Sequence, residues 1–156
     1  MDSGEWVTLG LDRRFGVERF RAHFTAHCYE RHAHETYAIG LTEEGSQSFH
    51  CRGATHRTRP GSVITFNPAE IHDGHATNAE GFLYRMLYVA PETVEAVLDD
   101  AGIRPPWALA FPNILSEDPV LGSLIARTAD AFAEPGATLA RSEALAAMVV
   151  GLARRQ

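Results

Sequence analysis

Lysine is absent from this chain of 156 residues, so all 14 of its Lys or Arg positions are arginines. With 20 acidic residues, the formal net charge is −6. A nucleic-acid-binding surface needs clustered basic side chains that displace counterions from phosphates. We therefore expect that this acidic chain does not bind DNA by itself.

Cysteines and long apolar runs are also scarce. The two cysteines, Cys28 and Cys51, are too few for the disulfide framework of a secreted domain. We expect both to be buried thiols, which could pair only if strands placed them side by side. No apolar run approaches the ~18–20 residues that cross a bilayer, and the N-terminus lacks a signal-peptide layout. We expect a cytoplasmic protein without a membrane partner.

Several catalytic and binding motifs are missing. The chain contains no nucleophile elbow, no glycine-rich phosphate loop and no Cys/His spacing of a zinc finger. These absences exclude the corresponding hydrolase, nucleotide-binding and zinc-finger classes. The length fits one structural domain that can bury a core without disulfides.

The stretch from residue 19 to 90 has the pattern of a β structure. Short runs rich in aromatic and β-branched residues alternate with turn formers such as Glu44-Gly45 and Pro60-Gly61. This spacing favours a sandwich or barrel over a βαβ fold. We expect strands at 20–24, 37–41, 47–51, 62–66 and 84–89, preceded by an N-terminal arm with one or two short strands.

After residue 90 the pattern changes to that of helices. The first begins at Pro91 and ends before Gly102, and the second is capped by residues 116–119 and broken by 134–136. The third is expected from about 138 to 154. Their apolar stripes either pack on the barrel or form a dimer interface. We expect residues 1–90 and 91–156 to form one structural domain of arm, barrel and helices.

All eight histidines lie between residues 23 and 75. His32 and His34 would share a face if their segment is a strand, and His72 could join them from a later strand. Three imidazoles suit a divalent metal such as Zn or Ni, with Glu70 or His75 as a candidate fourth ligand. The alternative is that these histidines line a pocket and bind a ligand or water.

The first of two motifs that mark the cupin family is G-x5-HxH-x3/4-E-x6-G. When its histidines are placed on His32 and His34, its closing glycine coincides with Gly45. The glutamate position falls on Ala38 and the opening glycine position on Ala26. The metal-ligating glutamate of the motif is therefore absent.

The second motif, G-x5-PxG-x2-H, matches at Gly61 and His72, but residues 67–69 read Asn-Pro-Ala in place of PxG. Together the two motifs indicate a resemblance to cupins. This resemblance implies a mainly β protein: a cupin-like double-stranded β-helix (jelly-roll barrel) followed by C-terminal α-helices.

Longer stretches resemble the N-terminal effector-binding domain of AraC-family transcription regulators. They read HAHETYAIGLTEEG, FHCRGATHRTRPGSVITFNPAEIHDG and YRMLYVAPE, within a resemblance that covers about residues 20 to 95. It implies a small-molecule effector in the barrel and a homodimer formed through the C-terminal helices. It also implies that DNA is bound only by a separate helix-turn-helix domain. We expect that this domain has been separated from the sensor domain, with a stand-alone relative as the alternative.

The candidate effector contacts are Tyr37, Phe66, Glu70, Arg85 and Trp107, beside the metal candidates His32, His34 and His72. Arg85 lies in an apolar strand, and a buried guanidinium needs an anionic partner. That partner would be Glu70, Asp73 or an anionic effector. Trp107 and Trp6 could cover the mouth of the barrel, with a core position as the alternative for Trp107.

We therefore predict an effector-sensing and dimerisation domain rather than an enzyme. One alternative is a small metal-dependent cupin enzyme, such as a dioxygenase or isomerase, with Glu70 as ligand or base. A second alternative is a pure dimerisation module with a filled barrel. The identity of the metal and the presence of a cavity distinguish these functions.

Overall fold

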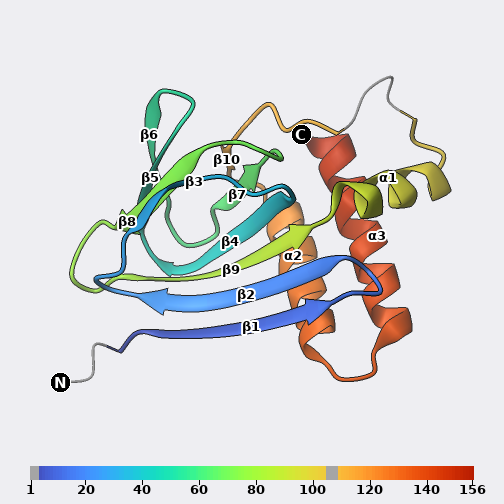
Figure 1. Cartoon of the computed structure of the whole chain (residues 1–156), viewed down its shortest axis with the longest axis horizontal. Helices are drawn as coiled ribbons and strands as arrows, with labels where there is room; N and C mark the ends of the chain where they lie inside the picture. The colour runs from blue at the N-terminus through green and yellow to red at the C-terminus, as the bar shows by residue number, and fades with distance from the viewer. Residues whose placement is uncertain (1–3, 105–108) are drawn as a thin grey trace.

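A computed structural model describes residues 4–104 and 109–156 and contains two antiparallel sheets that face each other (Figure 1). The larger sheet has the spatial order β1 (Trp6–Asp12), β2 (Val17–Phe24), β9 (Phe82–Val89), β4 (Tyr37–Gly45), β7 (Val63–Phe66) and β10 (Leu115–Ser116). The smaller sheet has the order β3 (Tyr29–His32), β8 (His72–Ala76), β5 (Gln47–Cys51) and β6 (Ala54–Arg57). The expected strands and the mainly β fold are confirmed.

Helix α2 (Pro119–Ala133) covers the outer face of the larger sheet, α3 (Thr138–Arg155) packs against α2, and α1 (Pro91–Asp100) packs against α3 (Figure 1). Helix α2 begins where the sequence predicts, because the Asp118 carboxylate accepts hydrogen bonds from the backbone N–H groups of Val120 and Leu121. The stripes of α2 and α3 are buried against the sheet and against each other, for example at Ile125 and Met148. This burial favours packing on the barrel over an open dimer seam for the stripes. Among the described residues, no helix is both long and apolar enough to span a membrane.

The larger sheet is buried on both faces, as its central strand β9 shows. Tyr84 and Met86 belong to the core between the two sheets, whereas Leu87 and Val89 belong to the core under the helices. Successive side chains of a strand point to opposite faces, so both sets in β9 are apolar. The cavity described below lies on the face shared by Tyr84 and Met86.

The expectation that both cysteines are buried is wrong for Cys28. Cys51 is buried at the end of β5, but Cys28 is exposed and both are free thiols. Cys28 lies in the turn between β2 and β3, where the chain passes from one sheet to the other. Apolar character alone did not reveal that this position is outside the core.

The N-terminal hairpin is anchored by Glu5. One of its carboxylate oxygens accepts hydrogen bonds from the backbone N–H groups of Thr25, Ala26 and His27 at 2.9, 2.6 and 2.9 Å. These bonds to the charged form, led by that from Ala26, lower the pKa of Glu5 from 4.5 to about 2. The carboxylate holds β1 beside the turn that follows β2.

We expect this anchor to be lost in acid. Because the pKa of Glu5 is lower in the folded chain than in the unfolded chain, its contribution to stability is complete above pH 4.5 and is lost as the pH falls through about 2. The amide proton shifts of Thr25, Ala26 and His27 should therefore titrate together with a midpoint near 2. In Glu5→Gln this transition should be absent, and a midpoint near 4.5 in the unmodified chain would contradict the anchor.

Candidate functional site

A cavity of about 530 Å³ opens between the two sheets. Its walls are largely aromatic, and the rings come from both sheets: Phe20, Tyr29, Phe49, Phe66, Tyr84 and Tyr88. Its polar lining includes the cluster of His32, His34 and His72, and also Glu18, Glu35, Thr36, Gln47 and Asp73. This volume, with apolar walls and a few convergent polar groups, is typical of a small-molecule site.

The three histidines meet although only two of them lie on strands. His32 ends β3 and is paired with His72, the first residue of β8. His34 follows β3, so the alternation expected for a continuous strand does not position it. The ring centroids of His32 and His72 lie 4.5 Å apart, and His34 lies 5.0 and 5.5 Å from them. One ring nitrogen of each residue lies within 4.8 Å of the others.

Backbone carbonyls orient two of these rings. The Nδ1 atom of His32 lies 2.6 Å from the carbonyl oxygen of Glu30, and Nδ1 of His72 lies 3.0 Å from that of Glu70. A carbonyl only accepts hydrogen bonds, so Nδ1 carries the proton in both rings. The lone pair of each neutral imidazole is then on Nε2, the usual arrangement for a histidine that binds a metal.

The cavity also favours neutral imidazoles. Burial lowers the pKa of His72 to about 4, and its ring stacks on Phe66 with the centroids 3.8 Å apart. Burial, followed by the proximity of His32, lowers the pKa of His34. At neutral pH both rings are therefore in the form that can donate a lone pair to a metal.

This donor set fits one divalent ion. Three nitrogen ligands with an open fourth position form a common zinc shell. The position of the cupin glutamate is occupied by Ala38, which is buried on β4 opposite Tyr88. The ring of Tyr88 lies 4.7 Å from that of His34 and lines the cavity there. A metal bound here would therefore have three histidine ligands.

The candidates for a fourth ligand lie elsewhere. The Glu70 carboxylate accepts hydrogen bonds from Arg52 and Asn67, and it is not part of the described histidine cluster. His75 is exposed, one residue out of phase with the buried Gly74 on β8. Among the described residues, the cluster therefore contains histidines alone.

Arg85 and Tyr37 lie on the opposite side of the larger sheet from the cavity. Arg85 forms ion pairs with Glu43 and with Asp130 of α2, and not with Glu70 or Asp73 as expected. The hydroxyl of Tyr37 donates a hydrogen bond to the carbonyl of Leu109 at 2.5 Å. Neither side chain lines the cavity, and their place under the helices follows from the burial of both faces of this sheet.

Phe66 lines the cavity, and its contact with an effector stays a prediction. Of the two tryptophans that could cover the mouth of the barrel, Trp6 does not line the cavity. Trp107 lies outside the described residues. Trp6 is 41% exposed on β1, with the Arg21 guanidinium 5.8 Å from its ring.

Sequence reasoning missed much of the aromatic wall. Tyr84 and Tyr88 share one face of β9, and the hydroxyl of Tyr84 donates a hydrogen bond to that of Tyr29 at 3.0 Å. Burial raises the pKa of Tyr84 well above its usual value, so its hydroxyl stays protonated. The alternation of Tyr84, Met86 and Tyr88 was a signal that these residues share one face, although it does not show that this face lines the cavity.

Ala69, in the turn before His72, replaces the glycine of the cupin motif and has a φ of 65°. Its N–H donates a hydrogen bond to the carbonyl of His34 at 2.7 Å, so the turn is tied to the site. The left-handed conformation costs an alanine ~1–2 kcal/mol, and a glycine adds ~0.4–1 kcal/mol of unfolded-state entropy.

We expect Ala69→Gly to stabilise the fold by about 0.5–1 kcal/mol, because the relief of strain exceeds the added entropy. The midpoint of urea denaturation should rise without a change in slope. Gly53→Ala, at φ 73° in the β5–β6 turn, is the reverse control and should destabilise. A fall in the midpoint for Ala69→Gly would show that the backbone of Ala69 is not strained.

The sequence matches the family described as AraC-like ligand binding domain over residues 14–149. An uncharacterised HTH-type transcriptional regulator of Bacillus subtilis, YbfI, is 27% identical over 96 residues, which are 62% of this chain and 35% of the relative. The chain thus spans about a third of the length of that curated relative.

Solved cupin structures share the fold at low sequence identity. A cupin-like protein of Thermotoga maritima is 18% identical with a TM-score of 0.51, over 57% of this chain and 71% of its own. A cupin superfamily protein of Desulfitobacterium hafniense is 10% identical with a TM-score of 0.51, over 58% and 81%. These likenesses support the double-stranded β-helix. Because the family match extends over most of the sequence, the chain belongs to the family of AraC-like ligand binding domains.

Proposed function

We propose that this domain senses a small-molecule effector in the cavity and passes its presence to a helix-turn-helix domain of a longer transcription regulator. The observation that carries the proposal is the cavity of about 530 Å³ with aromatic walls and a three-histidine end. The aromatic rings suit the face of a sugar or of another ring, and the histidines suit an oxygen-rich group. The family match and the helix-turn-helix relative support the regulatory role.

In this proposal, His32, His34 and His72 hold one divalent ion, zinc or nickel. A bound ion would supply a Lewis-acid position for an oxygen atom of the effector. The protein residues orient the site: the carbonyls of Glu30 and Glu70 fix two of the rings. The aromatic walls offer apolar surface to the effector.

A sensor without enzymatic activity is favoured over a metal-dependent cupin enzyme. The glutamate of the cupin motif is replaced by Ala38, and Glu70, the candidate base, is engaged by Arg52. If the domain were an oxygenase, its Fe(II)-loaded form should consume oxygen catalytically. Such turnover would contradict the sensor.

Two partner assignments complete the proposal. DNA contact belongs to a separate domain, because this chain is acidic and contains no lysine. The regulator is a homodimer through its helical layer, as the family resemblance implies. Sedimentation equilibrium of this domain tests the second assignment. A monomer at micromolar concentration would show that the helical layer is not sufficient to form the dimer.

The sensor is tested by thermal denaturation against a panel of monosaccharides, sugar acids and aromatic carboxylates. An effector should raise the melting temperature, and Phe20→Ala, which removes a ring from the cavity wall, should reduce this rise. Phe15→Ala is the matched control, because Phe15 is packed against the core on the helix side. Equal loss in both variants, or retention of the full effect in Phe20→Ala, would contradict binding in the cavity.

A further inference from the structure

The segment that connects α1 to α2 is fastened to the barrel by polar side chains. One described part of it, residues 109–116, ends in β10, which pairs with β7. Asn67 accepts a hydrogen bond from the N–H of Phe111 at 2.7 Å, and the hydroxyl of Thr65 donates to the carbonyl of Asn113 at 2.7 Å. We call residues 109–116 the connecting segment.

Arg52 joins this segment to the turn before His72. It lies at the tip of the β5–β6 hairpin with a φ of 53°. Its guanidinium donates hydrogen bonds to the carbonyls of Phe111 and Pro112 at 2.9 and 2.8 Å. The same guanidinium forms an ion pair with Glu70, whose side chain is only 13% exposed.

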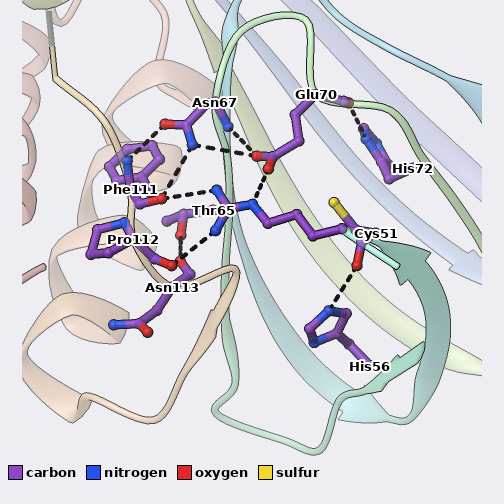
Figure 2. Close-up of polar contacts among 10 residues, drawn as sticks. Cys51, His56, Thr65, Asn67, Glu70, His72, Phe111, Pro112 and Asn113 are labelled. Atoms are coloured by element: carbon purple, nitrogen blue, oxygen red, sulfur yellow. Dashed lines mark hydrogen bonds and ion pairs between the residues drawn. The ribbon is translucent and has the colours of Figure 1, made fainter. Parts of the chain in front are cut away.

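The side-chain carboxylate and the backbone carbonyl of Glu70 both accept hydrogen bonds, as Figure 2 shows. Its carboxylate binds Arg52 and accepts a hydrogen bond from the N–H of Asn67 at 2.9 Å. Its carbonyl, on the other side of the residue, accepts the hydrogen bond from Nδ1 of His72 at 3.0 Å. Glu70 is therefore the residue through which the orientation of His72 and the position of Arg52 meet.

We propose that Glu70 and Arg52 are positioning residues that couple His72 to the connecting segment. If the His72 ring moves, the Glu70 carbonyl that accepts its hydrogen bond moves with it. The Glu70 carboxylate then shifts Arg52, and Arg52 alters its hydrogen bonds to the carbonyls of Phe111 and Pro112. The ring of Phe111 is buried in the core under the helices, 5.6 Å from that of Tyr37. The coupling deepens the proposed function, on which it rests, by naming the route from the cavity to the helical layer.

Thermodynamic reciprocity makes the coupling measurable from either end. If occupation of the histidine cluster tightens the connecting segment, loosening the segment must weaken binding at the cluster by the same factor. If Arg52 and Glu70 only held the two sheets together, replacing Arg52 would leave the His72 ring unchanged. The first measurement therefore uses the protein without any ligand.

Hydrogen exchange of residues 109–116 is compared in the unmodified chain, His72→Ala, Arg52→Ala and the double variant. We expect each single change to speed exchange of the Phe111 amide about 10-fold, although His72 has no described contact with that segment. The double variant should be no faster than Arg52→Ala alone, because both changes break one route. Glu70→Gln, which keeps the shape of the side chain, should give a smaller effect of the same sign.

The reverse direction is observed at the His72 ring. In Arg52→Ala, its ¹⁵N shifts should show a smaller fraction of the tautomer protonated at Nδ1. Arg59→Ala is the matched control, because it removes an arginine ion pair to Glu117 that has no described link to His72. An unchanged His72 ring in Arg52→Ala, together with unchanged exchange of residues 109–116 in His72→Ala, would overturn the coupling.

A second arm adds Zn²⁺. Zinc should slow exchange of residues 109–116 in the unmodified chain, and this response should be lost in Arg52→Ala. If zinc does not bind but the ligand-free coupling is observed, the metal site of the proposed function fails and the coupling holds. If zinc binds through the three histidines without a response in the segment, the coupling fails and the metal site holds.

Discussion

Replacing His72 with alanine is expected to lower the affinity of the domain for Zn²⁺ by at least about 100-fold. Loss of an outer partner of a metal ligand already costs ~10–100-fold in affinity, and His72 would be a ligand itself. A factor of 100 corresponds to about 2.7 kcal/mol, from ~1.4 kcal/mol per tenfold change. Its ring is packed on Phe66 and held through Nδ1, so no neighbouring side chain substitutes for it readily.

The measurement is a competition titration of purified, metal-free domain against a chelating dye. His75→Ala is the matched control, because His75 lies on the same strand but is exposed and outside the histidine cluster. In the unmodified chain, zinc at 100 times the dissociation constant should add about 2.7 kcal/mol to the free energy of unfolding. Equal weakening by His72→Ala and His75→Ala would show that zinc binds elsewhere.

The boundaries of the helices and the location of most strands could be predicted from local sequence. Asp118 followed by Pro119 marks the start of α2, and Thr138 begins α3 as expected. These features depend on backbone hydrogen bonds and turn conformations within a few residues. The cupin spacing also identified the three histidines that the fold brings together.

The faces of the larger sheet could not be predicted in the same way. Both faces are buried, so apolar residues occupy successive positions and their alternation does not distinguish cavity from helical layer. Tyr37 and Arg85 were therefore assigned to the cavity, although each lies under the helices. Residue parity relative to Ala38, the position of the cupin glutamate, would have placed Tyr37 on the far face.

Long-range polar contacts were the least predictable part of the structure. Arg52 contacts residues 59 and 60 positions away, and no local pattern indicates this partner choice. The chain contains no lysine, and some of these long-range contacts are made by single arginines that each bind several acceptors. Arg141, for example, donates to the Asp12 carboxylate and to the carbonyls of Ala131, Phe132 and Glu134. A planar guanidinium with five donors makes such multiple contacts, whereas the compact ammonium group of lysine does not.

Removing the ring of Phe111 is expected to have the largest effect on stability. The side chain is 1% exposed in the core under the helices, with Tyr37 beside it. Phe→Ala at such a position costs ~3–5 kcal/mol, because apolar contacts are lost and a cavity remains. Domains of this kind have a total stability of ~5–15 kcal/mol, so Phe111→Ala should lose a large part of it. The hydrogen bonds of residue 111 with Arg52 and Asn67 use its backbone C=O and N–H and are available in the variant.

Urea denaturation followed by circular dichroism measures the loss. Phe111→Leu, which keeps much of the volume, should cost less than ~1.5 kcal/mol, and Leu139→Ala, at a position 72% exposed, should stay within ~0.5 kcal/mol. A cost below ~1 kcal/mol for Phe111→Ala would mean that the connecting segment is not anchored in the helical core. In that case the contacts of Arg52 would end at a segment that is free to move without the helices, and the route from His72 to the helical layer would be broken at Phe111.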